Sequence, residues 1–185
     1  MRRIVAAEYV SLDGVMEEPA WTGPYFDEEL GKAQLDLLFA SDALLLGRVT
    51  YQGFAAAWPS MTDEQGFADR MNGLPKYVVS TTLTEVEWNN SRLIGENVAE
   101  EASGLKEQPG GDILIYGSGA LVRALMRENL IDEYRLMVFP VVLGRGKRLF
   151  GDGTAATDLE LVRTQTTGAG VVVLTYRPVR DVAEG

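Results

Sequence analysis

The sequence predicts an α/β fold, a three-layer α/β/α sandwich around a mixed, mostly parallel sheet with a C-terminal antiparallel hairpin. Short runs of consecutive apolar residues, typical of strands buried on both faces, alternate with segments of helical periodicity. Glycine turns follow two of these runs, as expected where a strand passes into a helix. Two further strand-like runs lie on either side of Gly168 and Gly170, which predicts the hairpin.

The individual elements follow from the spacing of apolar, glycine and proline residues. Asp13-Gly14 ends the first strand in a tight turn, and Pro59 ends the second helix. Residues 15–26 are expected to form a loop and residues 60–75 an irregular segment. Strands are expected at 4–10, 43–46, 77–80, 113–116, 134–142, 159–166 and 171–176, and helices at 27–40, from the first glycine turn to 57, 97–108 and 120–128.

Composition excludes several classes of function. The length of 185 residues predicts a single domain, residues 1–185, and the net charge of −10 argues against nucleic acid as a partner. The chain has no cysteine and no histidine, so disulfides, Ser-His-Asp triads and nearly all zinc chemistry are excluded, and we expect no metal. No apolar run approaches the ~20 residues of a membrane span. The N-terminus does not resemble a secretory signal, so we expect a cytoplasmic protein with no membrane partner.

Two glycine turns carry most of the functional information. Residues 47–51 and 116–121 each follow a buried strand and open a helix, which leaves unpaired backbone N–H groups and a positive dipole end at one edge of the sheet. Such positions bind phosphate, and two of them favour a dinucleotide. Val122 stands where the Rossmann fingerprint needs its third glycine, so a standard Rossmann domain is not expected.

Polar side chains at the strand ends support this interpretation, although each has a plainer alternative. The Arg48 guanidinium can bind a ribose phosphate, which favours NADP over NAD, or can form a surface salt bridge. The hydroxyls of residues 80–82 suit phosphate or ribose, or simply cap a turn. Glu8, in an apolar strand, either has a raised pKa or pairs with an arginine.

The chain also resembles the dihydrofolate reductase-like superfamily, in particular the group similar to the C-terminal reductase domain of bacterial riboflavin biosynthesis. The resemblance runs from Arg3 to about Arg177. It rests on motifs in a fixed order: 11–14, 47–51, 76–83, 113–121, and the stretch 130–134 that leads to 140–144 and 146–150.

The resemblance implies NADPH bound across the strand ends. Arg48 and Thr50 would lie at the adenosine and pyrophosphate end, and Ser80 and Thr81 near the 2′-phosphate. The second glycine turn would hold the pyrophosphate. Ala7, Tyr9, Asp13 and Met16 would flank the nicotinamide, and Tyr116 would offer its carbonyl. The implied cofactor-binding residues are Ala7, Met16, Gly47, Arg48, Thr50, Ser80, Thr81, Tyr116, Gly117, Ser118, Gly119, Ala120 and Leu121.

The chain departs from the dihydrofolate reductase pattern on the first helix. Those enzymes carry a carboxylate there that binds the pterin and assists its protonation. The matching place in this chain is near Gly31, with Leu35 one turn later, and Glu28 can share that face. Trp21 lies in the preceding loop, which is either a lid or a packed loop. Trp21, Glu28 and Leu35 are therefore the weaker substrate candidates.

The predicted function is an NADPH-dependent reductase that transfers a hydride to a small pterin- or pyrimidine-like heterocycle, or to an imine or carbonyl compound. The proton would come from water, Tyr9, Asp13 or a first-helix carboxylate, and water positioned by Asp13 is the first hypothesis. The alternatives are an NADP-binding module without turnover and a flavin- or deazaflavin-linked protein. The resemblance also implies a homodimer, with contact through residues 136–142 or the terminal hairpin.

Overall fold

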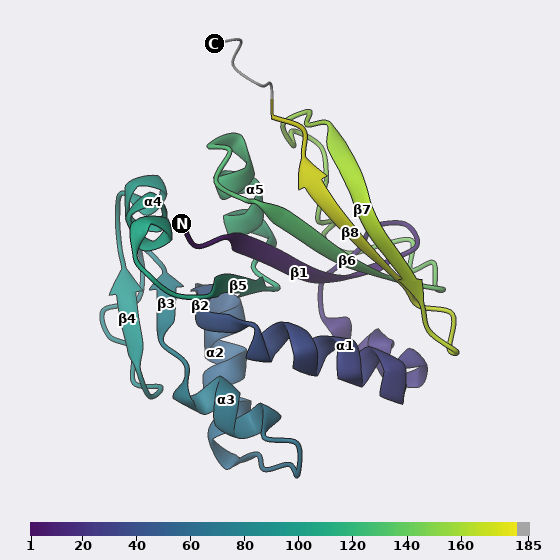
Figure 1. Cartoon of the computed structure of the whole chain (residues 1–185), viewed down its shortest axis with the longest axis horizontal. Helices are drawn as coiled ribbons and strands as arrows, with labels where there is room; N and C mark the ends of the chain where they lie inside the picture. Colours follow the sequence, from purple (N-terminus) through teal and green to yellow (C-terminus); the bar gives the residue numbers. More distant parts are fainter. Residues whose placement is uncertain (181–185) are drawn as a thin grey trace.

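The computed structural model describes residues 1–180, so the last five residues of the domain expected over 1–185 lie outside the described part. An eight-stranded sheet runs through it in the order β4-β3-β2-β5-β1-β6-β8-β7 (Figure 1). The strands are β1 Ile4–Ser11, β2 Ser41–Gly47, β3 Lys76–Val79, β4 Ser91–Ile94, β5 Asp112–Tyr116, β6 Glu133–Phe139, β7 Leu159–Thr166 and β8 Val172–Pro178. The helices are η1 Pro19–Tyr25, α1 Glu28–Phe39, α2 Arg48–Ala57, η2 Trp58–Ser60, α3 Phe67–Gly73, α4 Val98–Glu107 and α5 Gly119–Arg127, where η marks a 3-10 helix.

Strand directions confirm the predicted mixed sheet. Every pairing from β4 to β6 is parallel. Strand β8 is antiparallel to both β6 and β7, so the C-terminal hairpin closes one side of the sheet as expected.

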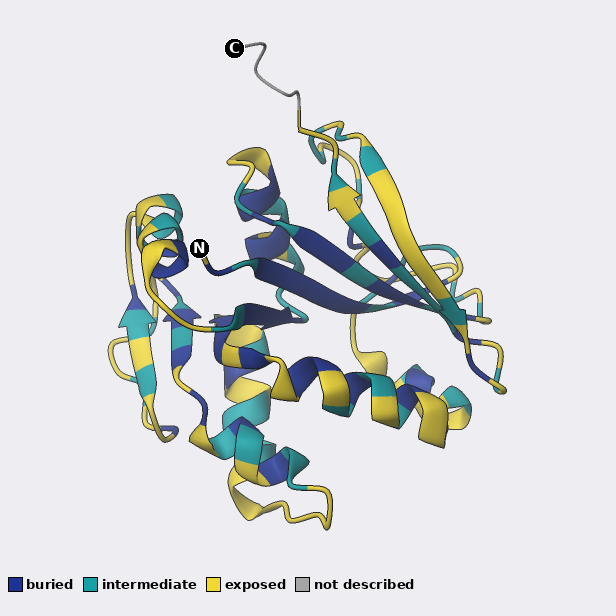
Figure 2. Ribbon diagram, in the orientation of Figure 1, coloured by how far each residue is buried: buried dark blue, intermediate teal, exposed yellow. Residues whose placement is uncertain are grey.

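Helices cover both faces of the sheet and make three layers (Figure 1). The face covered by α1, α2 and α3, called the α1 face below, buries Val5 and Ala7 of β1. The opposite face, covered by α4 and α5 and called the α5 face, buries Ile4 and Ala6. Strand side chains point alternately to the two faces, so the consecutive apolar run in β1 feeds both cores. Burial is deepest in the middle strands (Figure 2).

Five elements differ from the sequence prediction, of which η1 lies within the expected loop 15–26 and η2 follows the expected end of the second helix. Helix α3 lies where an irregular segment was expected; the carboxylate of Asp63 accepts hydrogen bonds from the N–H groups of Phe67 (3.0 Å) and Ala68 (2.6 Å) and so starts the helix. The short strand β4 pairs only with β3 and was not predicted. Strand β6 ends at Phe139 rather than at residue 142, because Pro140 has no N–H to donate to a neighbouring strand.

The two segments expected to form a dimer contact differ in their place in the sheet. Strand β6 is paired on both sides, with β1 and β8, so its backbone is not free for another chain. Strand β7 is an edge strand, and Leu161 and Val162 on it are exposed. Of the two expected segments, the hairpin is therefore the one that presents a sheet edge. Within residues 1–180, no helix combines the length and apolar character needed to cross a membrane.

Candidate active site

The parallel strands end together at one edge of the sheet, the carboxyl edge. Strands β1 and β5 are neighbours there, but β1 leads to α1 on one face and β5 leads to α5 on the other (Figure 1). In open α/β sheets, ligands bind outside the carboxyl ends of strands at such a switch in direction. The functional residues predicted on these strands therefore meet where the topology favours a ligand.

The two glycine turns are joined by hydroxyl groups. Ser118 Oγ accepts a hydrogen bond from Gly47 N at 2.9 Å and donates one to Tyr116 O at 3.0 Å. Ser118 N donates to Thr50 Oγ1 at 3.1 Å. We call this set of bonds, made by the hydroxyls of Thr50 and Ser118, the hydroxyl clamp. It holds the beginnings of α2 and α5 side by side.

Both clamped helices offer backbone donors at the carboxyl edge. Neither N-cap residue, Gly47 of α2 or Ser118 of α5, makes a side-chain capping bond. The first N–H groups of each helix have no partner within the helix, and the dipole there favours an anion. Arg48, the first residue of α2, is exposed and donates to Gln52 Oε1 at 3.1 Å. These donors suit phosphate.

Two long side chains flank the start of α5. A Cβ atom added to Gly119 would lie 2.6 Å from Met16 Sδ and 3.2 Å from Arg123 Nη1. Met16 therefore covers this turn, and an anion bound to Gly119 N requires its flexible side chain to swing aside. Arg123 was not among the residues predicted from the sequence, although its spacing of four residues from Gly119 places it above the turn.

Three of the predicted cofactor-binding residues can offer only backbone groups to a ligand, because their side chains are unreactive: Ala7, Ala120 and Leu121. Ala7 is buried beside Tyr116, with which it is in register, and Leu121 packs into the core below α5. Ala120 is exposed at the first turn of that helix.

The hydroxyls after β3 were predicted either to bind phosphate or ribose or to cap a turn. Ser80 is buried, and its Oγ accepts hydrogen bonds from Thr82 N (3.1 Å) and Leu83 N (3.0 Å), which is the turn-capping alternative. Thr81 is exposed beside it.

Asp13 is held by hydrogen bonds to its carboxylate. Its oxygens accept from Ser11 Oγ (2.6 Å), Leu143 N (3.1 Å) and Gly144 N (2.8 Å). These bonds, that of Ser11 foremost, lower the pKa of Asp13 to about 2. Asp13 is thus ionised at neutral pH with no proton to give, and it ties the turn after β1 to the segment after β6.

Replacing Asp13 by Asn is expected to make stability less sensitive to acid. A carboxylate whose pKa is lowered on folding stabilises the folded state above its unfolded pKa, and that stability is lost as the pH falls through the folded pKa. For Asp13 the window runs from the ordinary value of 3.8 down to about 2. The Tm difference between wild type and Asp13→Asn should therefore shrink as the pH falls across this window. Asp152→Asn, on an exposed turn, is the control and should show no such change in its Tm difference from wild type. A Tm difference for Asp13→Asn that stays constant with pH would contradict the stabilising role of the Asp13 carboxylate.

Gln34, rather than a carboxylate, is the α1 residue that meets Tyr9. Gln34 is 4% exposed, and its Nε2 donates to Tyr9 Oη at 2.7 Å. Glu28 is exposed at the first position of α1, and Leu35 is half-buried one residue past Gln34. The sequence signal for Gln34 was its place on the buried stripe of α1, between Leu30 and Leu38.

Burial makes Tyr9 and Tyr116 weak acids. Burial raises the pKa of Tyr9 to about 12, against the opposite effect of the Gln34 hydrogen bond. Burial also raises the pKa of Tyr116, and the nearby Tyr9 adds to the shift. Both phenols therefore keep their protons at neutral pH.

Aromatic rings surround these groups on the α1 face. Phe139 makes edge-to-face contacts with Tyr9 and with Trp21, both with centroids 5.5 Å apart, and with Tyr25 at 6.2 Å. Phe54 packs against Tyr116 in the same way. Trp21 thus belongs to a packed aromatic group that includes Tyr9.

Glu8 lies on the opposite, α5 face. It is 1% exposed, and within residues 1–180 its Oε1 has no hydrogen-bond partner and its carboxyl forms no ion pair. Burial therefore raises its pKa well above the ordinary value. Of the two alternatives for Glu8, the arginine pair was wrong and the raised pKa is the one found.

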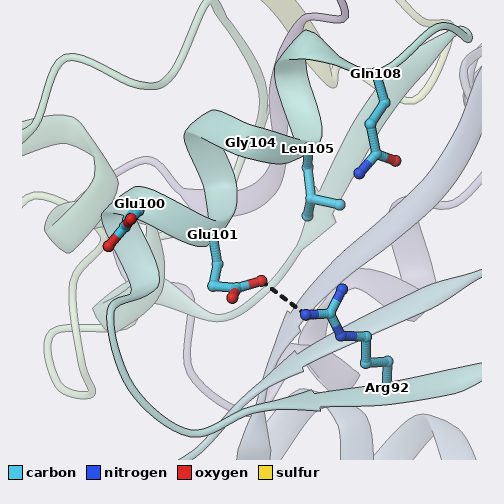
Figure 3. Close-up of a pocket in the computed structure, with 6 residues that line it drawn as sticks. All are labelled: Arg92, Glu100, Glu101, Gly104, Leu105 and Gln108. Atoms are coloured by element: carbon cyan, nitrogen blue, oxygen red, sulfur yellow. Dashed lines mark hydrogen bonds and ion pairs between the residues drawn. The ribbon is translucent and has the colours of Figure 1, made fainter.

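A surface hollow of about 190 Å³ lies between α4 and β4, away from these groups (Figure 3). Arg92 on its wall is already paired with Glu101, with 2.9 Å between Nη2 and Oε2. The hollow contains none of the residues predicted to bind a ligand.

The chain has the α/β fold of dihydrofolate reductase-like proteins. Residues 2–173 match the model of the RibD C-terminal domain. The chain belongs to that family, which supports a reductase-type function. It is 35% identical to the uncharacterized protein YyaP of Bacillus subtilis (strain 168), over 95% of this chain and 94% of that protein.

Solved structures share the fold. A provisionally named riboflavin biosynthesis protein from Shewanella sp. PV-4 superposes with a TM-score of 0.76 at 21% identity, over 96% of this chain and 99% of that one. Dihydrofolate reductase from Enterococcus faecalis, solved in complex with NADP(H), superposes with a TM-score of 0.63 at 14% identity, over 96% of this chain and 97% of that one.

Proposed function

We propose that this protein is an NADPH-dependent reductase that transfers a hydride to a small heterocyclic, imine or carbonyl substrate at the carboxyl edge between β1 and β5. The observation that carries the proposal is the hydroxyl clamp. It brings two uncapped helix N-termini together beside Arg48, and such paired donors match a ligand with two linked phosphates. The neighbour solved with NADP(H) supports the same cofactor.

We call the two clamped helix starts, at the turns of Gly47 and Gly117, the cradle, and propose that it binds the pyrophosphate. A Cβ atom on Gly117 would lie 2.8 Å from Thr50 Oγ1, so glycine is needed here for the two turns to approach closely enough for the bond from Ser118 N to Thr50. The N–H groups at the starts of α2 and α5 would receive the pyrophosphate, with Arg123 as the nearby positive charge, and the exposed Arg48 at the start of α2 would contact the 2′-phosphate. This local charge offsets the acidic surface that the net charge of −10 implies.

The residues next to the cradle suit hydride transfer. A reduced nicotinamide supplies a hydride when bound. Ala7, beside Tyr116, adds only a methyl group at this point of the sheet. The aromatic group around Phe139 gives the adjacent part of the α1 face an apolar surrounding. Asp13 fixes the loop that carries Met16, and the phenol of Tyr9 retains a proton for the substrate.

Titration of the pure protein with NADPH and NADH tests the proposal. We expect NADPH to bind more tightly than NADH and to raise Tm, because a ligand that binds the folded state stabilises it. NADPH oxidation is then screened with pterins, pyrimidines and imines. Absence of binding by either nucleotide would remove the reductase proposal, and binding without oxidation of any acceptor would favour the module without turnover.

Arg48→Ala should weaken NADPH binding far more than NADH binding. Loss of one hydrogen bond to a charged group costs about 1.5–3 kcal/mol, which corresponds to roughly a 10- to 100-fold rise in the Kd for NADPH. Arg92→Ala, an exposed arginine on β4, is the matched control. An equal rise in Kd for both nucleotides in Arg48→Ala would contradict the proposed contact between Arg48 and the 2′-phosphate.

A further inference from the structure

Three polar side chains lie on the α1 face, and we call them the polar cluster: the half-buried Tyr9 of β1 and the buried Gln34 of α1 and Tyr116 of β5. Gln34 Nε2 donates to Tyr9 Oη at 2.7 Å. Within residues 1–180, neither Gln34 Oε1 nor Tyr116 Oη has a hydrogen-bond partner, although both atoms are buried. Buried polar atoms without partners are rare in folded proteins, so two in one cluster indicate a role beyond packing.

The geometry leaves the proton of Tyr9 uncommitted. A phenol has one O–H donor, and Gln34 occupies a lone pair on its oxygen. No acceptor for the Tyr9 proton exists among the described residues. Tyr116, in register with Ala7, lies on the neighbouring strand and on the same face as Tyr9, and Tyr9 contributes to the raised pKa of Tyr116. The cluster thus holds two phenolic protons next to the carboxyl edge.

Among the described residues, the carboxyl groups considered as proton donors are either ionised or lie elsewhere. Asp13 is ionised and its carboxylate is occupied by three hydrogen bonds. Glu28 is exposed at the start of α1, Glu8 lies on the α5 face, and the chain has no histidine. A reductase must still deliver one proton for every hydride.

We propose that Gln34 is a positioning residue that holds Tyr9 as the proton donor of the reduction, an inference that rests on the reductase function proposed above. As the acceptor carbon of C=N or C=O receives the hydride, the π electron pair moves to nitrogen or oxygen. The Tyr9 O–H bond breaks and the new N–H or O–H bond forms. The remaining Tyr9 phenolate keeps the hydrogen bond from Gln34 Nε2 and regains a proton from water, directly or through Tyr116.

The amide suits this role because it donates without a charge of its own. A hydrogen bond to an ionised acceptor is about twice as strong as one between neutral groups, so Gln34 binds the phenolate better than the phenol. A carboxylate at this position would repel the phenolate instead. The raised pKa of Tyr9 keeps the donor protonated across the neutral range.

The test uses Gln34→Leu, Tyr9→Phe and the double variant, with Gln108→Leu as the control for the same chemical change on exposed α4 surface. Tyrosine is isotope-labelled at the ring carbon that bears the hydroxyl, and NMR spectra are recorded on the NADPH-saturated proteins. The Tyr9 resonance is identified by its loss in Tyr9→Phe. We expect it to move in Gln34→Leu and to stay in place in Gln108→Leu.

Rates of NADPH oxidation, with dihydropterin as the probe acceptor, are then compared among the wild type, the two single variants and the double variant. Tyr9→Phe should lower kcat by about 10²–10⁴-fold, the usual contribution of a general acid. Gln34→Leu should lower kcat by about 10-fold through the lost charge-assisted bond, with the Kd for NADPH unchanged. In the Tyr9→Phe background, Gln34→Leu should cause no further loss, because residues that act through one another are not additive.

Two results would overturn the inference: an unmoved Tyr9 resonance in Gln34→Leu, or an equal loss of kcat from Gln34→Leu with and without Tyr9. Failure of the reductase function itself is distinguished, because it appears in the wild type alone, as absent NADPH binding or as NADPH binding without oxidation of any acceptor.

Discussion

Gly117→Val is expected to raise the Kd for NADPH by at least about 100-fold, or close to 3 kcal/mol of binding free energy. Gly117 has a φ of +54°, a conformation in which a β-branched residue is strained by about 1–3 kcal/mol. Its added Cβ would lie 2.8 Å from Thr50 Oγ1. The valine must therefore push the two glycine turns apart and break the bond from Ser118 N to Thr50.

Gly104→Val is the matched control, since Gly104 lies on α4 and a Cβ there meets no atom within 4 Å. NADPH titration of both variants, with near-ultraviolet circular dichroism to confirm the fold, separates loss of the cradle from loss of structure. A folded Gly117→Val protein that binds NADPH as tightly as wild type would remove the turn from the binding site.

Lys76→Met should have the largest effect on stability, a loss of about 3–5 kcal/mol in the free energy of unfolding. Lys76 at the start of β3 is fully buried, and its ammonium donates to the carbonyls of Asn72 (2.8 Å), Leu74 (2.9 Å) and Asn89 (2.9 Å). It also lies 4.1 Å from the centroid of Trp88. Burial lowers its pKa to about 8, so it is still charged at neutral pH. Methionine keeps the hydrocarbon stem and removes a donor from all three carbonyls, of which that of Asn72 still accepts from Asn89 Nδ2 at 3.3 Å.

Such a loss is a large part of the 5–15 kcal/mol that typically stabilises a domain. Chemical denaturation followed by tryptophan fluorescence measures it. Lys32→Met is the control, because Lys32 is exposed and pairs only with Asp36 on the same helix, a contact worth about 0.3–0.5 kcal/mol. A Lys76→Met protein within about 1 kcal/mol of wild type would show that water satisfies the carbonyls.

Local sequence signals predicted the frame of this site well. The apolar runs and the turns at Gly47 and Gly117 depend only on neighbouring residues, and the structure places both turns at the carboxyl edge. Helix α3 was not predicted because its start depends on Asp63, which lies in an exposed loop with no helical periodicity. Strand β4 was not predicted because a four-residue edge strand has little sequence pattern of its own.

Side-chain partners were harder to predict, because they depend on contacts between distant segments. Asp13 was assigned to water near the substrate, but its carboxylate binds backbone 130 and 131 residues further along the chain. An acid on the first helix was expected near Gly31, whereas the side chain that contacts Tyr9 is the neutral Gln34. The composition gave no hint that an amide would stand there.

The hydroxyl clamp has a consequence for how the cradle responds to salt. Thr50 and Ser118 join α2 and α5 through uncharged groups, so the spacing of the two helix starts does not depend on ionic strength. Attraction of an anionic ligand to Arg48 and to the helix dipoles is screened, since the Debye length is about 8 Å at physiological salt. Added salt should therefore weaken binding without reshaping the receptor. The salt dependence of NADPH affinity would then depend on the charge of the cradle alone, because the spacing of the two helix starts stays constant.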